Sequence, residues 1–146
     1  MFEGNCMSVA VALTFVWLGL VLGLSFMEAP LKFRAPGVTR EIGLGIGRLV
    51  FKALNASEIV LAVAIILALV VDDAEAGKWI ALIGLPALLG AQTVMLHGFM
   101  DKRAARIVAG EQLPPSNQHY IYIALEVVKV ALLIALGTQL LKGLTS

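Results

Sequence analysis

The residues best suited to chemistry are polar side chains that stand inside otherwise apolar stretches. They are Asn55, Glu58, Gln92, Thr93, His97, Tyr122, Glu126 and Lys129. Carboxylates, an amine and an imidazole can bind or relay charge, and histidine does so near neutral pH. An ionisable group at the centre of a membrane costs several kcal/mol. These side chains are therefore expected to face other protein groups rather than lipid.

The spacing of these residues predicts that they meet in one layer. Thr93 and His97 are i,i+4, while Tyr122, Glu126 and Lys129 follow i,i+4,i+3 spacing, so each set shares one helix face. Asn55 and Glu58 share a face in the same way. The first apolar stretch carries three polar residues on one side: Thr14, Ser25 and Glu28. We therefore expect a polar layer to which every helix contributes.

Three interpretations of this layer remain open. In the first, Glu126 and Lys129 pair one turn apart, Glu58 and His97 bond to neighbours, and the layer only fixes helix packing. In the second, it is part of a pathway for an ion, a proton or a small solute. In the third, His97, Glu58 and Glu126 ligate a metal, or His97 and His119 hold a haem. We find no set of nucleophile, base and orienting residue, so neither an enzyme nor a cofactor is predicted.

Composition identifies the elements that must position this layer. Hydrophobic residues make up 60% of the chain and charged residues 14%, well below the usual quarter. The runs 9–27 and 79–96 contain no charge, and about 20 apolar helical residues span a bilayer. We predict an all-α, polytopic integral membrane protein. It is a single four-helix transmembrane domain over residues 1–146, with spans at about 7–27, 53–71, 79–98 and 120–141.

Local signals predict where the first two helices end and begin. Pro30 and Pro36 are expected to break the first helix. Thr39 is the predicted N-cap of the second helix, which therefore starts near residue 38, before its span. Three alternate glycines in its first turns predict close packing or a bend: Gly43, Gly45 and Gly47.

The later boundaries follow from similar signals. The acidic loop 72–78 lacks the spacing of a calcium loop and is predicted to be a solvated turn. The third helix is expected to start near Lys78, to bend at Pro86 and to stop at Gly110 beyond its span. Ser116 or Asn117 would cap the fourth helix. Gly19 and Gly23 form a GxxxG pair, which favours packing inside the bundle or contact with another copy.

Eight of the eleven basic residues lie in or beside two of the connections. They are Lys32, Arg34, Arg40, Arg48, Lys52, Lys102, Arg103 and Arg106. The positive-inside rule places both connections in the cytoplasm and both termini outside, with the second and third helices extended into the cytoplasm. Because these residues flank apolar runs, a nucleic-acid partner is not expected. Cys6 is the only cysteine, which excludes an intramolecular disulfide.

The run WLGLVLGLSFMEAPLKFRAPGVTREIGLGIGRLVFKALNASEIV resembles the first helical hairpin of small four-helix membrane proteins related to human transmembrane protein 205 and their bacterial relatives. The matching features are the glycine-spaced first helix, the break at Pro30 and Phe33, and a long second helix. The basic extension DKRAARIVAG is a second similarity. The resemblance implies a four-helix bundle with suggested roles in transport or resistance, and it leaves a single bundle and an oligomer both open. It carries over no catalytic motif.

These observations predict a channel- or transporter-like protein of the inner membrane, whose partners are the lipid bilayer and further copies of the chain. The alternative is a non-catalytic subunit or scaffold that docks on partner membrane subunits through its basic cytoplasmic extensions. The eight basic residues could equally bind anionic lipid headgroups, at about 1 kcal/mol for each one near the surface.

Overall fold

The computed structural model describes residues 3–114 and 117–146, and within them it contains helices and no strand. The first rod comprises α1 (Glu3–Val21), a π-helical segment (Leu22–Glu28), α2 (Ala29–Leu31) and a 3₁₀ turn (Lys32–Arg34). The second rod is α3 (Arg40–Val71). The third comprises a π-helical segment (Ile80–Gly84), α4 (Leu85–Val94), another π-helical segment (Met95–Met100) and α5 (Asp101–Val108). The fourth rod is α6 (Gln118–Thr145).

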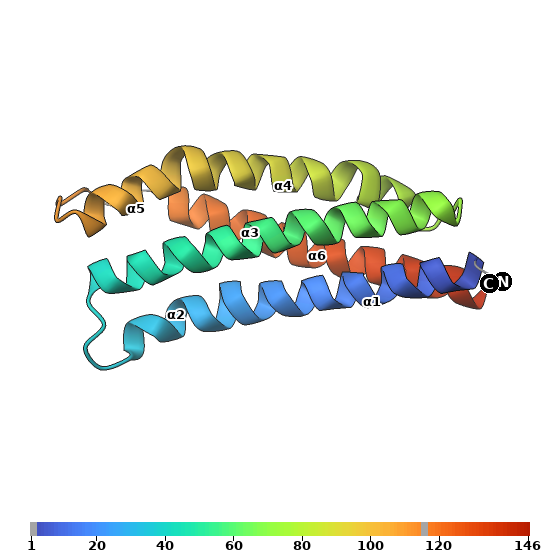
Figure 1. Cartoon of the computed structure of the whole chain (residues 1–146), viewed down its shortest axis with the longest axis horizontal. Coiled ribbons are helices and arrows are strands. Elements are labelled where there is room, and N and C mark those ends of the chain that lie inside the picture. The colour runs from blue at the N-terminus through green and yellow to red at the C-terminus, as the bar shows by residue number, and fades with distance from the viewer. Residues whose placement is uncertain (1–2, 115–116) are drawn as a thin grey trace.

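The four rods lie side by side in one elongated bundle (Figure 1). α1 packs against α3 and α6, α4 packs against the same two helices, and α5 packs against α3. The α2–α3 connection, the end of α5 and the start of α6 lie at one end of the bundle, which we call the basic end (Figure 1). The α3–α4 connection, the start of α1 and the end of α6 lie at the other. The prediction that both basic connections share one end is confirmed.

All four rods are long and apolar enough to cross a membrane: 5–34, 40–71, 80–108 and 120–145. α3 has 32 residues, which at 1.5 Å per residue gives about 48 Å, well beyond a hydrocarbon core of about 30 Å. Many large apolar side chains point outward from the bundle, including Leu49 and Val60. The all-helical, four-helix prediction is confirmed, and α3 extends beyond one bilayer thickness, as expected from its start.

The expectation that Pro30 breaks the first helix is wrong. The helix continues through Pro30 to Arg34, because the preceding turns widen into a π-helix in which the amide of Ala29 bonds to the carbonyl of Leu24, five residues back. Proline lacks an amide hydrogen and its ring clashes with the carbonyl four residues back. A π-turn immediately before it is one way to relieve that clash. The chain leaves the helix only at Ala35, which is extended.

The third rod accommodates Pro86 in the same way, with a π-helical segment directly before the proline. The segment Ile80–Gly84 is π-helical, and the amide of Leu85 bonds to the carbonyl of Ile80, again five residues back and directly before the proline. A further π-helical segment, Met95–Met100, precedes no proline. Both prolines within the long helices are thus absorbed by a local change of hydrogen-bond register.

The predicted Thr39 cap and Gly110 stop are confirmed. The Thr39 hydroxyl accepts a hydrogen bond from the Ile42 amide at 3.3 Å, and α3 starts at the next residue. Gly110 has a φ of 95°, and the bonds Gly110 N–H to Ile107 O and Glu111 N–H to Arg106 O form a Schellman motif. The third helix begins at Lys78, as expected. Asn117 stands at the cap position of α6, but its side chain makes no capping hydrogen bond, and Ser116 lies outside the described residues.

Two of the three alternate glycines, Gly43 and Gly47, lie against side chains of the α2–α3 connection, which confirms the expectation of close packing. A Cβ at Gly43 would overlap the Phe33 ring, and one at Gly47 would lie 2.7 Å from Lys32 Nζ. Gly45 has more room, since its nearest neighbour would be Val108 at 3.9 Å. A Cβ at Gly19 or Gly23 would meet nothing within 4 Å. The GxxxG pair therefore makes no close contact within the described bundle, and its contact with another copy stays a prediction.

These contacts predict opposite effects for two neighbouring substitutions. Gly43→Ala should lower the free energy of unfolding by about 1–3 kcal/mol, because the added methyl group forces the Phe33 ring away from α3. Gly45→Ala should be neutral or stabilising by up to about 1 kcal/mol, because alanine is the better helix former. Denaturation of the detergent-purified variants measures both. Equal stability would mean that Phe33 does not rest on α3.

Candidate functional site

Three ionisable side chains meet in the interior of the bundle, and we call them the buried triad: Glu58, Glu126 and Lys129. Each is 1% exposed. Lys129 Nζ lies 2.6 Å from Glu58 Oε2 on α3 and 2.7 Å from Glu126 Oε1 on its own helix. One ammonium therefore bridges two carboxylates. The predicted Glu126–Lys129 pair is confirmed, and Glu58 proves to be its third member.

Neighbouring helices add neutral donors to both carboxylates. The indole nitrogen of Trp17 on α1 donates to Glu58 Oε2 at 2.8 Å. The amide nitrogen of Gln92 on α4 donates to Glu126 Oε1 at 2.7 Å. Hydrogen bonds to charged groups contribute about 1.5–3 kcal/mol each. The buried triad and its two donors thus join all four rods, which agrees with the predicted layer to which every helix contributes.

The buried triad is not electrically balanced. When all three groups are ionised, two carboxylates and one ammonium leave a net charge of −1. Glu126 Oε2 is buried and accepts no hydrogen bond, although its twin oxygen Oε1 accepts two. Burying an ion away from water carries an effective penalty of several kcal/mol. One proton or one monovalent cation at Glu126 would therefore neutralise the buried triad and give Glu126 Oε2 a partner.

The other predicted layer residues on α3, α4 and α6 are also brought together, with one exception. Thr93 on α4 donates to Asn55 Oδ1 on α3 at 3.0 Å, and Tyr122 is buried one turn before Glu126. His97 is exposed on the π-helical segment of the third rod and does not join the buried triad. His97 therefore does not share the inward face of Gln92, which is buried.

The metal interpretation loses its ligand set as a result. Its three ligands were to be His97, Glu58 and Glu126, and the imidazole is on the outside of the bundle. Within residues 3–114 and 117–146, no group of three or more histidine, cysteine or acidic side chains could hold a metal ion. The side chain of His119, the second ligand of the haem interpretation, lies outside the described residues.

The basic residues divide into paired and exposed groups. Arg48 and Lys52 on α3 both bond to Asp101 on α5, the latter at 3.1 Å, and so hold these two helices together. Arg103 donates to the carbonyl of Pro114, and Arg106 pairs with Glu111 at 2.6 Å. The others that point outward are Arg34, Arg40 and Lys102.

Lys32 lies elsewhere than expected for a residue that binds lipid headgroups. Its side chain is only 9% exposed and lies 3.6 Å from Glu28, one turn earlier. Its ammonium also lies 5.6 Å and 5.5 Å from the ring centroids of Phe33 and Phe51, within cation–π distance. Lys32 therefore turns into the bundle, under the connection that covers Gly47.

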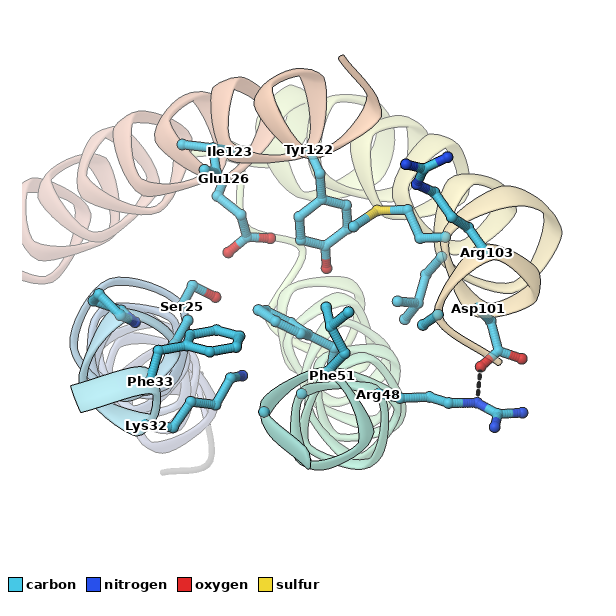
Figure 2. A pocket seen from close by; sticks show the side chains of 18 of the residues that line it. Ser25, Lys32, Phe33, Arg48, Phe51, Asp101, Arg103, Tyr122, Ile123 and Glu126 are labelled. Atoms are coloured by element: carbon cyan, nitrogen blue, oxygen red, sulfur yellow. Dashed lines mark hydrogen bonds and ion pairs between the residues drawn. The ribbon is translucent and has the colours of Figure 1, made fainter. Parts of the chain in front are cut away.

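A pocket of about 660 Å³ lies near the basic end and reaches Glu126 of the buried triad. Apolar side chains form most of its wall, among them Phe26, Phe33, Leu44, Phe51, Leu96 and Ile107. In Figure 2, Ser25, Tyr122 and Glu126 direct their oxygen atoms into the same space, and Arg48 turns away from it toward Asp101. Its volume is in the range of pockets that hold small organic molecules.

Beyond the buried triad the interior is apolar except for Thr14, whose buried hydroxyl donates to the carbonyl of Ala10 on its own helix. The side chains that follow toward the other end pack into one core: Ala10, Ile65, Leu69, Leu133, Leu136 and Leu140. Each of the three α6 leucines is fully buried. None of these core residues lines the pocket, so the pocket does not continue through this part of the bundle.

Trp17 is the site residue that the sequence interpretation missed. It is fully buried, whereas the other tryptophan, Trp79, lies at the start of the third rod and is exposed. A tryptophan near a helix end is typical of a membrane interface, but one in the middle of an apolar run has an indole N–H that needs an acceptor. The position of Trp17 in the middle of the first apolar run was therefore the sequence signal that could have identified it as a site residue.

No family model, no curated protein and no solved structure matches the chain.

The shared ammonium predicts a charge-dependent stability series. Lys129→Met should lower the free energy of unfolding by about 3–5 kcal/mol, because it leaves two buried carboxylates without a cation. Adding Glu58→Gln and Glu126→Gln to Lys129→Met should restore most of that loss, because the buried charges are then absent. Lys142→Met, at an exposed position of α6, is the control and should be neutral. A triple variant no more stable than Lys129→Met would contradict the charge argument.

Proposed function

We propose that the protein is a small, transporter-like membrane protein that takes a proton or a small solute into the pocket from its basic end. The buried triad is the site that holds the transported charge. The observation that supports this most directly is Glu126 Oε2, a buried carboxylate oxygen without a donor, in a pocket that lies near the basic end. A purely structural polar cluster gains nothing from such an oxygen, since an unsatisfied buried acceptor costs free energy.

The apolar core beyond the pocket favours a transporter over an open channel. A channel needs a continuous polar or hydrated route, whereas here fully buried leucines follow Lys129 along α6. A transporter exposes its site to one side at a time and moves helices against each other to expose the other. The three π-helical segments lie in the two rods that flank α3, and such segments are frequent at functional sites.

In the proposed orientation the basic end faces the cytoplasm and both termini lie outside the inner membrane. The eight basic residues at or near that end support this through the positive-inside rule. A homo-oligomer is part of the proposal, because four packed helices leave no second passage within one chain.

The second candidate function is that of a scaffold in a larger membrane complex. The observation in its favour is that Arg34, Arg40 and Lys102 are exposed at the basic end, where they could meet an acidic partner or anionic headgroups. Reproducible co-purification with a larger complex from native membranes would favour this second function.

The transport proposal predicts a proton conductance that depends on the buried triad. Proteoliposomes loaded with a pH-sensitive dye, with a potassium gradient and valinomycin as driving force, should acidify at least several-fold faster than empty liposomes. Glu58→Gln and Glu126→Gln should each abolish the difference while retaining the hydrogen bonds that an amide oxygen can accept. Glu75→Gln, an exposed carboxylate at the other end, is the matched control. Unchanged rates in both triad variants would mean that the polar cluster is structural.

The proposed orientation predicts opposite labelling of the two ends. In a Cys6→Ser background, Lys102→Cys should react with a membrane-impermeant maleimide only from the cytoplasmic side and Glu75→Cys only from the outside. Both positions are exposed, so reactivity should depend on access rather than burial. Labelling of both positions from the same side of intact cells would overturn the orientation.

A further inference from the structure

We propose that the pocket binds an organic monocation with an apolar body, whose charge lies against Glu126 Oε2. This inference deepens the proposed function by naming the class of solute. It rests on the same pocket but is tested by binding, independently of movement across a membrane.

Two oxygen atoms without hydrogen-bond partners indicate the charge of the ligand. Ser25 Oγ from the first rod and Glu126 Oε2 from α6 are both buried without a hydrogen-bond partner, and both residues line the pocket. Figure 2 shows the two side chains on either side of the same space, with the Tyr122 hydroxyl beside it. Glu126 Oε2 can only accept when ionised, so a ligand that fits it must donate a hydrogen bond or carry positive charge, while the Ser25 hydroxyl can accept from the ligand or donate to it.

The net charge of the buried triad also favours a monovalent cation as the ligand. The buried triad carries a net charge of −1 when ionised, so one monovalent cation makes the region neutral. A divalent cation would reverse the imbalance. It would also need several oxygen ligands at short range, and no such group of side chains exists in the described residues.

The walls define the rest of the ligand. They are mostly aliphatic and aromatic, and the rings of Phe33 and Phe51 already hold one cation, the ammonium of Lys32, at 5.6 Å and 5.5 Å. Aromatic faces attract cations that have shed much of their water. An alkyl or aryl ammonium or phosphonium ion satisfies such walls, whereas a small hydrated metal ion leaves them without contacts.

The basic residues of the lining do not oppose this assignment, because most of them are already engaged. Arg48 is bonded to Asp101, Arg103 to the carbonyl of Pro114, and Lys32 to Glu28 and the two rings. Arg40, at the first turn of α3, is the exposed one. The opposite assignment, an anion held by Lys32, is a separate proposal that the test distinguishes.

A pair of probes of the same shape and opposite charge tests the inference. Tetraphenylphosphonium and tetraphenylborate are titrated into the full-length protein in detergent, and binding is measured by equilibrium dialysis against empty micelles. We expect saturable binding of the phosphonium, weakened at least tenfold by Glu126→Gln and unchanged by Glu75→Gln. Tetraphenylborate should bind no better than to empty micelles.

A second variant guards against a misfolded Glu126→Gln. Ser25→Ala removes the other unpartnered oxygen without breaking any hydrogen bond, and it should weaken phosphonium binding about threefold. The inference is overturned by absence of saturable phosphonium binding, by equal affinity in both variants and the parent, or by stronger binding of the borate. A proton conductance without phosphonium binding would sink this inference alone, while phosphonium binding without any flux would sink only the transport proposal.

Discussion

One ammonium group determines how the interior of this bundle is arranged. Lys129 is shared between carboxylates on two helices, and each carboxylate takes a further hydrogen bond from another rod. A rotation of any helix by one residue would leave a buried charge without its partner. In apolar surroundings an unpaired charge costs several kcal/mol. Dispersion contacts between leucines are individually weak and similar at every register, so they differ by less than this between alternative packings. The buried triad therefore specifies the packing that the apolar residues only stabilise.

Much of the architecture could be predicted because its signals are local. The lengths of the apolar runs, the Thr39 cap and the Gly110 stop each depend on a few adjacent residues. The π-helical segments could not be found in this way, because a turn that closes on the fifth residue has no distinct pattern in sequence. One consequence was missed with them, because Pro30 continues a helix. The exposed side chain of His97 was missed separately, since i,i+4 spacing to Thr93 says only that the two share a face and not that the face is buried. Lys32 turned inward for another reason: Gly43 and Gly47 leave a groove on α3 for the connection.

The two halves of the bundle are built for different tasks. From the buried triad toward the termini, leucine, isoleucine and alanine fill the interior and the rods are closely packed. Toward the basic end, widened turns, glycines and a short connection leave a pocket with mixed walls. This division matches the proposed function, in which one half provides stability and the other provides access. The same division makes the polar residues of the accessible half the more informative ones for mutation.

The distribution of the buried triad along the chain also bears on how the protein would be assembled in a bilayer. α6 carries Glu126 and Lys129 one turn apart, so it can leave the insertion machinery as an internally neutral segment. α3 carries Glu58 alone and is made earlier, when its only available partner is Trp17 on α1. Glu58 therefore gains its ammonium partner only when the last helix has been synthesised. A chain cut before α6 would keep the acid of α3 and the indole that bonds to it, but would lack the cation that balances its charge.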